Sequence, residues 1–111
     1  MSKFNLTRDI NGYNGFGLMF SEDKFSVSLA ATVEQHFTIP GNYDKWIAIF
    51  SFTPGSEVWV ANNFTATLPS GALSSTYSEL NPTARQVKAG DVISFIASGD
   101  NISVGVTLYA L

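Results

Sequence analysis

His36 and Glu34 are the first residues whose types and spacing could support chemistry. His36 is the single histidine of the chain, and Glu34 lies two residues before it. In an extended segment, residues two apart share a face, so a Glu-oriented histidine could act as a general base on a serine nucleophile. No serine stands at a spacing that completes such a triad, and no Gly-x-Ser-x-Gly turn is present. We therefore predict a surface or interface histidine and no catalytic residues.

The carboxylates also fall short of a catalytic or metal-binding arrangement. Glu22 and Asp23 are adjacent in a turn-like context, whereas glycoside hydrolysis needs two carboxylates facing each other across a cleft. The segment from Asp9 to Gly12 begins like a calcium loop, but its glycine comes too early for that motif. The chain has no cysteine, which excludes disulfides and thiolate metal sites. We predict no metal site and no cofactor, with a lone calcium site in a loop as the alternative.

Aromatic side chains are the strongest signal in the composition, at 14% of the residues. Large aromatics commonly anchor protein interfaces, and on a β-sandwich exposed Trp and Tyr can also stack on sugars. A core role and sugar binding are therefore the alternatives to a protein contact. We predict that a partner protein is contacted by Phe4, Leu6, Tyr13, Trp46 and Trp59.

The charge of the chain limits the kind of partner. Only 14% of the residues are charged, against about 25% in an ordinary domain, which favours a surface that contacts other protein chains. The net charge is -3 and the six basic residues are scattered, so neither nucleic acid nor an anionic membrane is expected as a partner. No apolar run approaches the roughly 18 residues of a membrane span, and residues 1–8 lack the apolar core of a secretory signal. We expect synthesis in a cytoplasm.

The elements that must position these side chains are short strands. Residues 102–110 alternate between apolar and small or polar side chains, which is typical of a strand with one face in a core. Similar patterns predict two strands, or one long bent strand, between residues 25 and 39, with Val33 on the same face as Phe37. Further strands are expected at 16–20, 46–52, 57–61, 64–68 and 92–97, and the longest loop-like stretch at 69–82.

The spacing of these strands predicts the fold class. About eight short strands separated by turns, without a helical period over three turns, indicate an all-β, single-domain β-sandwich of jelly-roll type. Asparagine and glycine interrupt any periodicity before Lys24. We therefore predict an irregular N-terminal arm or lead-in over residues 1–24 and a β-sandwich domain over residues 25–111.

Three stretches resemble small virion structural proteins of tailed bacteriophages, the group that includes head decoration or cement proteins: Phe37–Trp46, Ser78–Ser94 and Val104–Leu111. The resemblance extends over roughly residues 33–111. It implies a non-enzymatic protein of the capsid surface that binds the major capsid protein of the assembled head, often as a trimer. Residues 46–52 are apolar on both faces, which also predicts a homo-oligomer. A carbohydrate-binding or receptor-binding module of a phage tail is the alternative.

Overall fold

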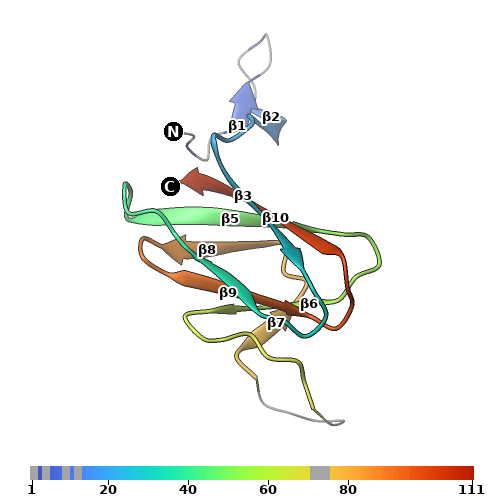
Figure 1. Cartoon of the computed structure of the whole chain (residues 1–111). Helices are drawn as coiled ribbons and strands as arrows, with labels where there is room; N and C mark the ends of the chain where they lie inside the picture. Colours follow the sequence, from blue (N-terminus) through green and yellow to red (C-terminus); the bar gives the residue numbers. More distant parts are fainter. Residues whose placement is uncertain (1–2, 4–5, 9–10, 12–13, 71–75) are drawn as a thin grey trace.

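Every regular element in the described part of the chain is a β-strand (Figure 1). The computed structural model describes residue 3, residues 6–8, residue 11, and residues 14–70 and 76–111. The strands are β1 (Leu6–Arg8), β2 (Asn14–Leu18), β3 (Asp23–Leu29), β4 (Gln35–Thr38), β5 (Lys45–Phe52), β6 (Val58–Asn62), β7 (Ser78–Leu80), β8 (Ala84–Lys88), β9 (Val92–Ala97) and β10 (Ile102–Ala110).

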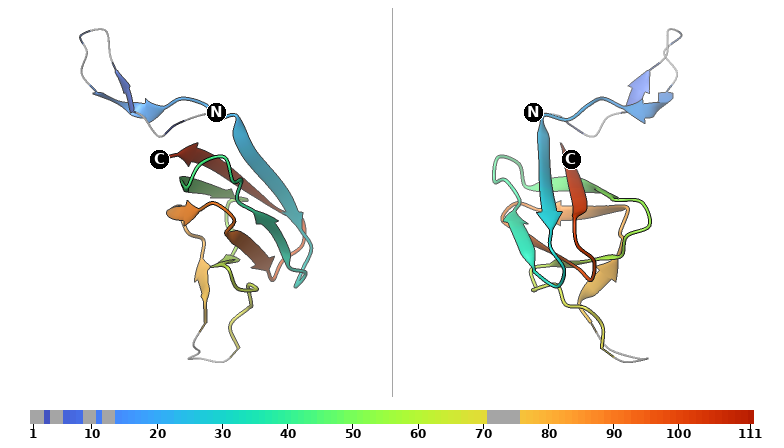
Figure 2. Two further views of the ribbon diagram at one scale, coloured as in Figure 1. Left: turned by 90° about the vertical axis from the view of Figure 1, so that its left-hand side faces the viewer. Right: turned by 45° about the vertical axis from the view of Figure 1, so that its right-hand side comes forward.

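Strands β3 to β10 form two four-stranded sheets that face each other (Figure 2). Their orders are β3-β10-β5-β8 and β4-β9-β6-β7, and all pairings within them are antiparallel. Each strand of the first half pairs with its counterpart from the other end of the sandwich: β3 with β10, β4 with β9, β5 with β8 and β6 with β7. This eight-strand order is that of a jelly roll, and the prediction of an all-β sandwich is confirmed.

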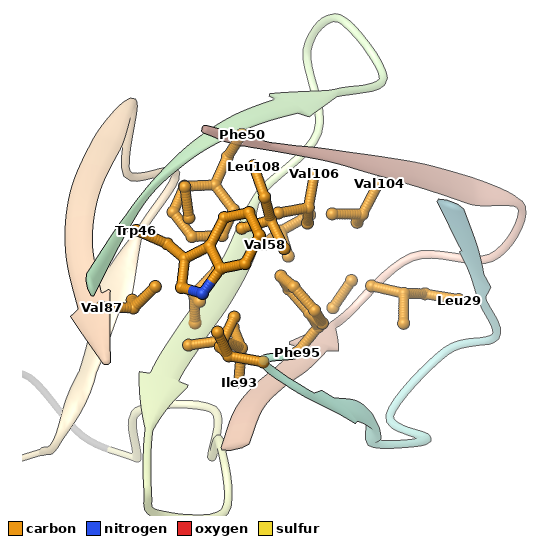
Figure 3. Packing of buried hydrophobic residues seen from close by; sticks show 14 of the residues in the cluster. Leu29, Trp46, Phe50, Val58, Val87, Ile93, Phe95, Val104, Val106 and Leu108 are labelled. Carbon is orange, nitrogen blue, oxygen red and sulfur yellow. The ribbon is translucent and has the colours of Figure 1, made fainter. Parts of the chain in front are cut away.

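The core lies between the two sheets, around Trp46 (Figure 3). The indole of Trp46 has no exposed surface, and its Nε1 donates a hydrogen bond to the carbonyl of Pro40 over 3.2 Å. Phe95 packs edge-on against Phe50, with ring centroids 6.2 Å apart. The buried cluster consists of Leu29, Ile39, Trp46, Ala48, Phe50, Val58, Val60, Val87, Ile93, Phe95, Ala97, Ile102, Val104, Val106, Leu108 and Ala110.

Strand β10 lies inside its sheet, hydrogen-bonded to β3 on one side and to β5 on the other. Its alternation places one set of side chains inward, as the sequence predicts. All of them are at most 7% exposed: Ile102, Val104, Val106, Leu108 and Ala110.

Residues 25 to 39 form two separate strands rather than one bent strand, and the expected position of Val33 is wrong. Strand β3 ends at Leu29, and Thr32, with a positive φ of 60°, lies in the turn that leads the chain into the other sheet. Val33 is 47% exposed in this turn, whereas Phe37 points inward from β4 and stacks on Phe95. The two-residue period is therefore interrupted between Leu29 and Gln35.

The predicted strand at 64–68 is absent, and β7 lies in the stretch predicted to be a loop. Residues 64–68 cross the outer face of the sheet β4-β9-β6-β7. There the amide N–H of Ala66 donates to Ser94 Oγ and that of Thr67 donates to Ser78 Oγ. The backbone of this segment thus bonds to side chains of the sheet. Alternation of apolar residues alone does not distinguish a strand paired within a sheet from an extended segment that crosses the face of one.

The N-terminal segment is more regular than predicted. Strands β1 and β2 form an antiparallel hairpin with Leu6 opposite Leu18 (Figure 1). This two-stranded sheet is separate from the sandwich, and β3 begins at Asp23. With the hairpin included, the molecule measures 53 × 29 × 25 Å.

Candidate functional site

A groove of about 290 Å³ on the outer face of the sheet β4-β9-β6-β7 collects the polar side chains that could do chemistry. Edge strand β4 and the turn before it form one side, β9 forms the floor, and the crossing segment after β6 forms the other side. The lining residues are Glu34, His36, Asn63, Phe64, Thr65, Val92 and Ser94.

Glu34 is the centre of a hydrogen-bonded cluster in this groove. Its Oε2 accepts from Ser94 Oγ over 2.5 Å and lies 3.2 Å from His36 Nδ1, and its Oε1 lies 3.3 Å from the same nitrogen. The register of β4 with β9 places His36 opposite Ser94 on one face. The predicted Glu34–His36 pair is therefore present, and the His36 side chain is 61% exposed.

This cluster is arranged to hold a carboxylate in place, and the serine is not paired with the imidazole. The hydroxyl of Ser94 donates to Glu34 and accepts from the Ala66 amide N–H, so both of its functions are occupied. Ser94 is only 2% exposed. A serine nucleophile needs an open approach for the substrate, which Ser94 lacks in this geometry, and the group it donates to is a carboxylate rather than the imidazole.

A stacked aromatic pair stands beside the groove. The rings of Phe64 and Tyr77 are nearly parallel, at 5°, with centroids 3.9 Å apart. Both are solvent-exposed, at 51% for Phe64 and 73% for Tyr77. Mutual stacking fixes the orientation of two exposed rings at little further entropic cost.

Asp91 fixes the segment that carries Phe64. Its Oδ2 accepts from the Lys88 backbone N–H over 2.9 Å and from Asn62 Nδ2, and its Oδ1 accepts from Asn63 Nδ2 over 3.0 Å. Asn63 Oδ1 in turn accepts from the amide N–H of Val92. Partial burial acts to raise the pKa of Asp91. The hydrogen bonds from Lys88, Asn63 and Asn62 and the charge of Lys88 outweigh it, so the pKa lies below its ordinary value of 3.8.

We expect Asp91→Asn to lower the free energy of unfolding by about 1 kcal/mol at neutral pH, because charge-assisted hydrogen bonds are lost. A carboxyl whose pKa is lower in the folded state stabilises the fold above its unfolded pKa and loses this effect as the pH falls through the folded value. The difference between Asp91→Asn and the original chain should therefore shrink below pH 3.8. Denaturant titrations across this range measure it.

Glu57→Gln is the matched control, since Glu57 is an exposed carboxylate in the turn before β6. It should change stability much less than Asp91→Asn at neutral pH. A difference between Asp91→Asn and the original chain that stays constant down to the most acidic pH would contradict the assignment of the effect to the Asp91 carboxylate.

The residues predicted to contact a partner are not gathered in one place. Phe4 and Tyr13 lie outside the described residues, as does the side chain of Leu6, whose backbone belongs to β1. Trp46 is fully buried, so its predicted partner contact is wrong. Its side chain lies on the inward face of β5 and packs in the core. Trp59 is half-buried on the outer face, on the side opposite Val58 and Val60, as predicted.

Trp59 lies between Leu80 of β7 and Ile96 of β9 in the register of the sheet. Leu80 is 46% exposed. This apolar row shares the outer face with the groove, so Trp59 is placed where a partner could reach it.

Sequence reasoning missed Ser94 and Phe64 as parts of the site. Ser94 lies 60 residues from Glu34 along the chain, and only the β4–β9 pairing brings them together. Phe64 was predicted to lie in a strand. The Asn62–Asn63 pair was the one local signal, because asparagine favours turns, and Asn63 does adopt a positive φ of 61°.

Among the described residues, no group of three or more His, Asp or Glu side chains is placed to hold a metal ion. The same part of the chain contains no helix that could span a membrane. A scan against protein-family models matches no family to this sequence, and searches of curated proteins and of solved structures find no match either.

Proposed function

We propose that this chain is a non-enzymatic structural protein of a tailed-phage virion that decorates the assembled head by binding its major capsid protein. The observation that carries the proposal is the β1–β2 hairpin, which forms a sheet of its own outside the sandwich (Figure 2). A hairpin of two strands is marginally stable alone in water, so a projecting one is suited to gain stability from a docking partner.

The connection between hairpin and sandwich is anchored on the sandwich side. Ser21 Oγ donates to the carbonyl of Leu108 over 2.5 Å, and the Tyr109 hydroxyl donates to the carbonyl of Met19. Met19 is 51% exposed and Phe20 is 93% exposed at the base of the hairpin. Contiguous exposed apolar surface marks contact sites, and these two neighbouring side chains contribute to such surface. The hairpin is thus held at a defined exit point with apolar surface beside it.

The outer face of the sheet β3-β10-β5-β8 supports assembly into an oligomer, for which we propose a trimer. Ile47 and Ile49 of β5 are half-buried there, with Tyr109 and Thr107 of β10 opposite them. These four side chains carry no charge, while Lys24, Lys45 and Lys88 lie at the margins of the same face. In a chain with so few charged residues, an uncharged strip at the centre of a sheet face is suited to a contact between identical subunits.

The jelly-roll fold is compatible with a role on a capsid, by analogy with other proteins of this architecture. Jelly rolls occur among viral capsid domains and among lectins, so the architecture narrows the function without deciding it. A decorating protein is present in many copies on one particle, and each copy adds a modest contact energy that opposes separation of the capsid subunits.

The test adds purified protein to capsids that lack it, prepared from the phage that encodes the chain, and measures occupancy by cryo-electron microscopy. We expect regular density from the original chain, with three copies at each site. A chain starting at Met19, which lacks the hairpin, should bind about tenfold more weakly or worse, because the hairpin contact is lost.

Thermal unfolding of the shortened chain is the control, because its sandwich should unfold as cooperatively as that of the original chain. Failure of the original chain to bind these capsids would overturn the proposal. If the shortened chain binds as well as the original, the contact lies on the sandwich, and Trp59→Ala should then lower occupancy.

A further inference from the structure

We propose that the groove between Glu34 and Phe64 is a binding site for a small saccharide of one or two rings. This site is separate from the hairpin and from the proposed capsid contact, so it can be present whether or not the chain decorates a head. Its volume of about 290 Å³ lies just below the range of roughly 300–1,000 Å³ that is typical of small-molecule sites.

The aromatic wall provides a platform that is already oriented. Phe64 lines the groove and its ring is stacked on Tyr77, with centroids 3.9 Å apart. Asp91 and Asn63 fix the backbone from which Phe64 projects. A sugar presents a flat array of C–H groups on one face, which packs well on an aromatic ring that does not have to be ordered on binding.

The opposite wall provides an oriented acceptor for sugar hydroxyls. Glu34 is held by Ser94 Oγ at 2.5 Å and by contact with His36 Nδ1 at 3.2 Å, and its side chain is still 25% exposed. A carboxylate has about four lone-pair positions, so Oε1 can still accept from ligand hydroxyls. Nδ1 of His36 faces Glu34, so Nε2 is the ring nitrogen that a ligand hydroxyl can reach, and the Thr65 hydroxyl can both donate and accept.

This mixture of groups favours a saccharide over a basic side chain of a protein. An ammonium or guanidinium group can also lie over a ring face, but it carries donors only and cannot accept from a donor of the groove. The groove instead combines acceptors, a hydroxyl and a ring face, and sugar hydroxyls both donate and accept. The apolar floor given by Val92 suits the carbon skeleton of a ring.

The test follows the backbone amide signals of the full chain by NMR during titration with glucose, galactose, mannose and N-acetylglucosamine, together with a glycan array. We expect at least one sugar to shift the signals of Ala66, Val92 and Ser94. Phe64→Ala and Glu34→Gln should each weaken this binding about tenfold, because they remove the stacking platform and the charged acceptor.

Glu34→Gln keeps an oxygen that can accept from Ser94, so the groove should retain its shape, which the unchanged amide spectrum elsewhere would show. Glu57→Gln is the charge-matched control and should bind sugar as the original chain does. The proposal is overturned if no sugar or arrayed glycan binds, or if binding is unaffected by both groove variants. It is equally overturned if arginine amide shifts these signals while no saccharide does, since the groove would then receive a cationic side chain.

Discussion

Ending the chain at Asn101 should abolish folding. The deletion removes β10, which pairs with both β3 and β5 in the centre of its sheet. The inward side chains of this strand are at most 7% exposed, and each contributes roughly 1–3 kcal/mol of hydrophobic stabilisation. Their sum is comparable with the total stability of a domain, about 5–15 kcal/mol. Circular dichroism and denaturant titration of the shortened chain should show no cooperative transition.

The chain that begins at Met19 is the matched control for this truncation, because it also loses a terminal segment but keeps every strand of the sandwich. It should unfold cooperatively. A chain ending at Asn101 that unfolds at the original midpoint would show that the remaining strands form a stable fold without β10, and that the observed pairing does not determine stability.

Trp46→Ala should produce the largest loss of stability of any single substitution considered, about 3–5 kcal/mol. Trp46 is the largest fully buried side chain and belongs to the core cluster between the sheets (Figure 3). The substitution leaves a cavity between the sheets and also leaves the carbonyl of Pro40 without its indole donor. Denaturant titration gives the change in the free energy of unfolding.

Two further variants test the assignment of Trp46 to the core: Trp46→Phe separates packing from hydrogen bonding, and Trp59→Ala compares a buried with a half-buried tryptophan. Trp46→Phe retains most of the buried ring while losing the bond to Pro40, so it should cost less than the alanine variant. Trp59→Ala removes the same type of side chain from a half-buried outer position and should cost only about 1 kcal/mol. Equal losses from Trp46→Ala and Trp59→Ala would contradict the assignment of Trp46 to the core.

The sequence largely determined which segments are strands and which of their faces turn inward. In β10 the alternation is uninterrupted because the strand has one face in the core, so its inward set could be predicted residue by residue, whereas β9 was predicted only as a buried strand. The shared face of Glu34 and His36 follows from the same period of two. These features are local, and a local pattern is sufficient to specify them.

Alternation could not decide between the core and a partner contact for the two tryptophans. Each precedes or lies among apolar residues in a strand, and both were predicted to face a partner. Trp46 faces the opposite sheet, whereas Trp59 faces outward. The difference depends on which face of each strand meets the other sheet, and this is decided by how the strands pair.

Only the tertiary structure created the groove. Ser94 lies on the outer face of β9 and is still only 2% exposed, because residues 64–68 cross above it. Phe64 and Glu34 reach opposite sides of one groove through the pairing of β4 with β9 and the bonds of Asp91. Hydrogen bonds between residues far apart in the chain leave no periodic signal, so composition and spacing determined the strands, and long-range pairing decided where the functional side chains meet.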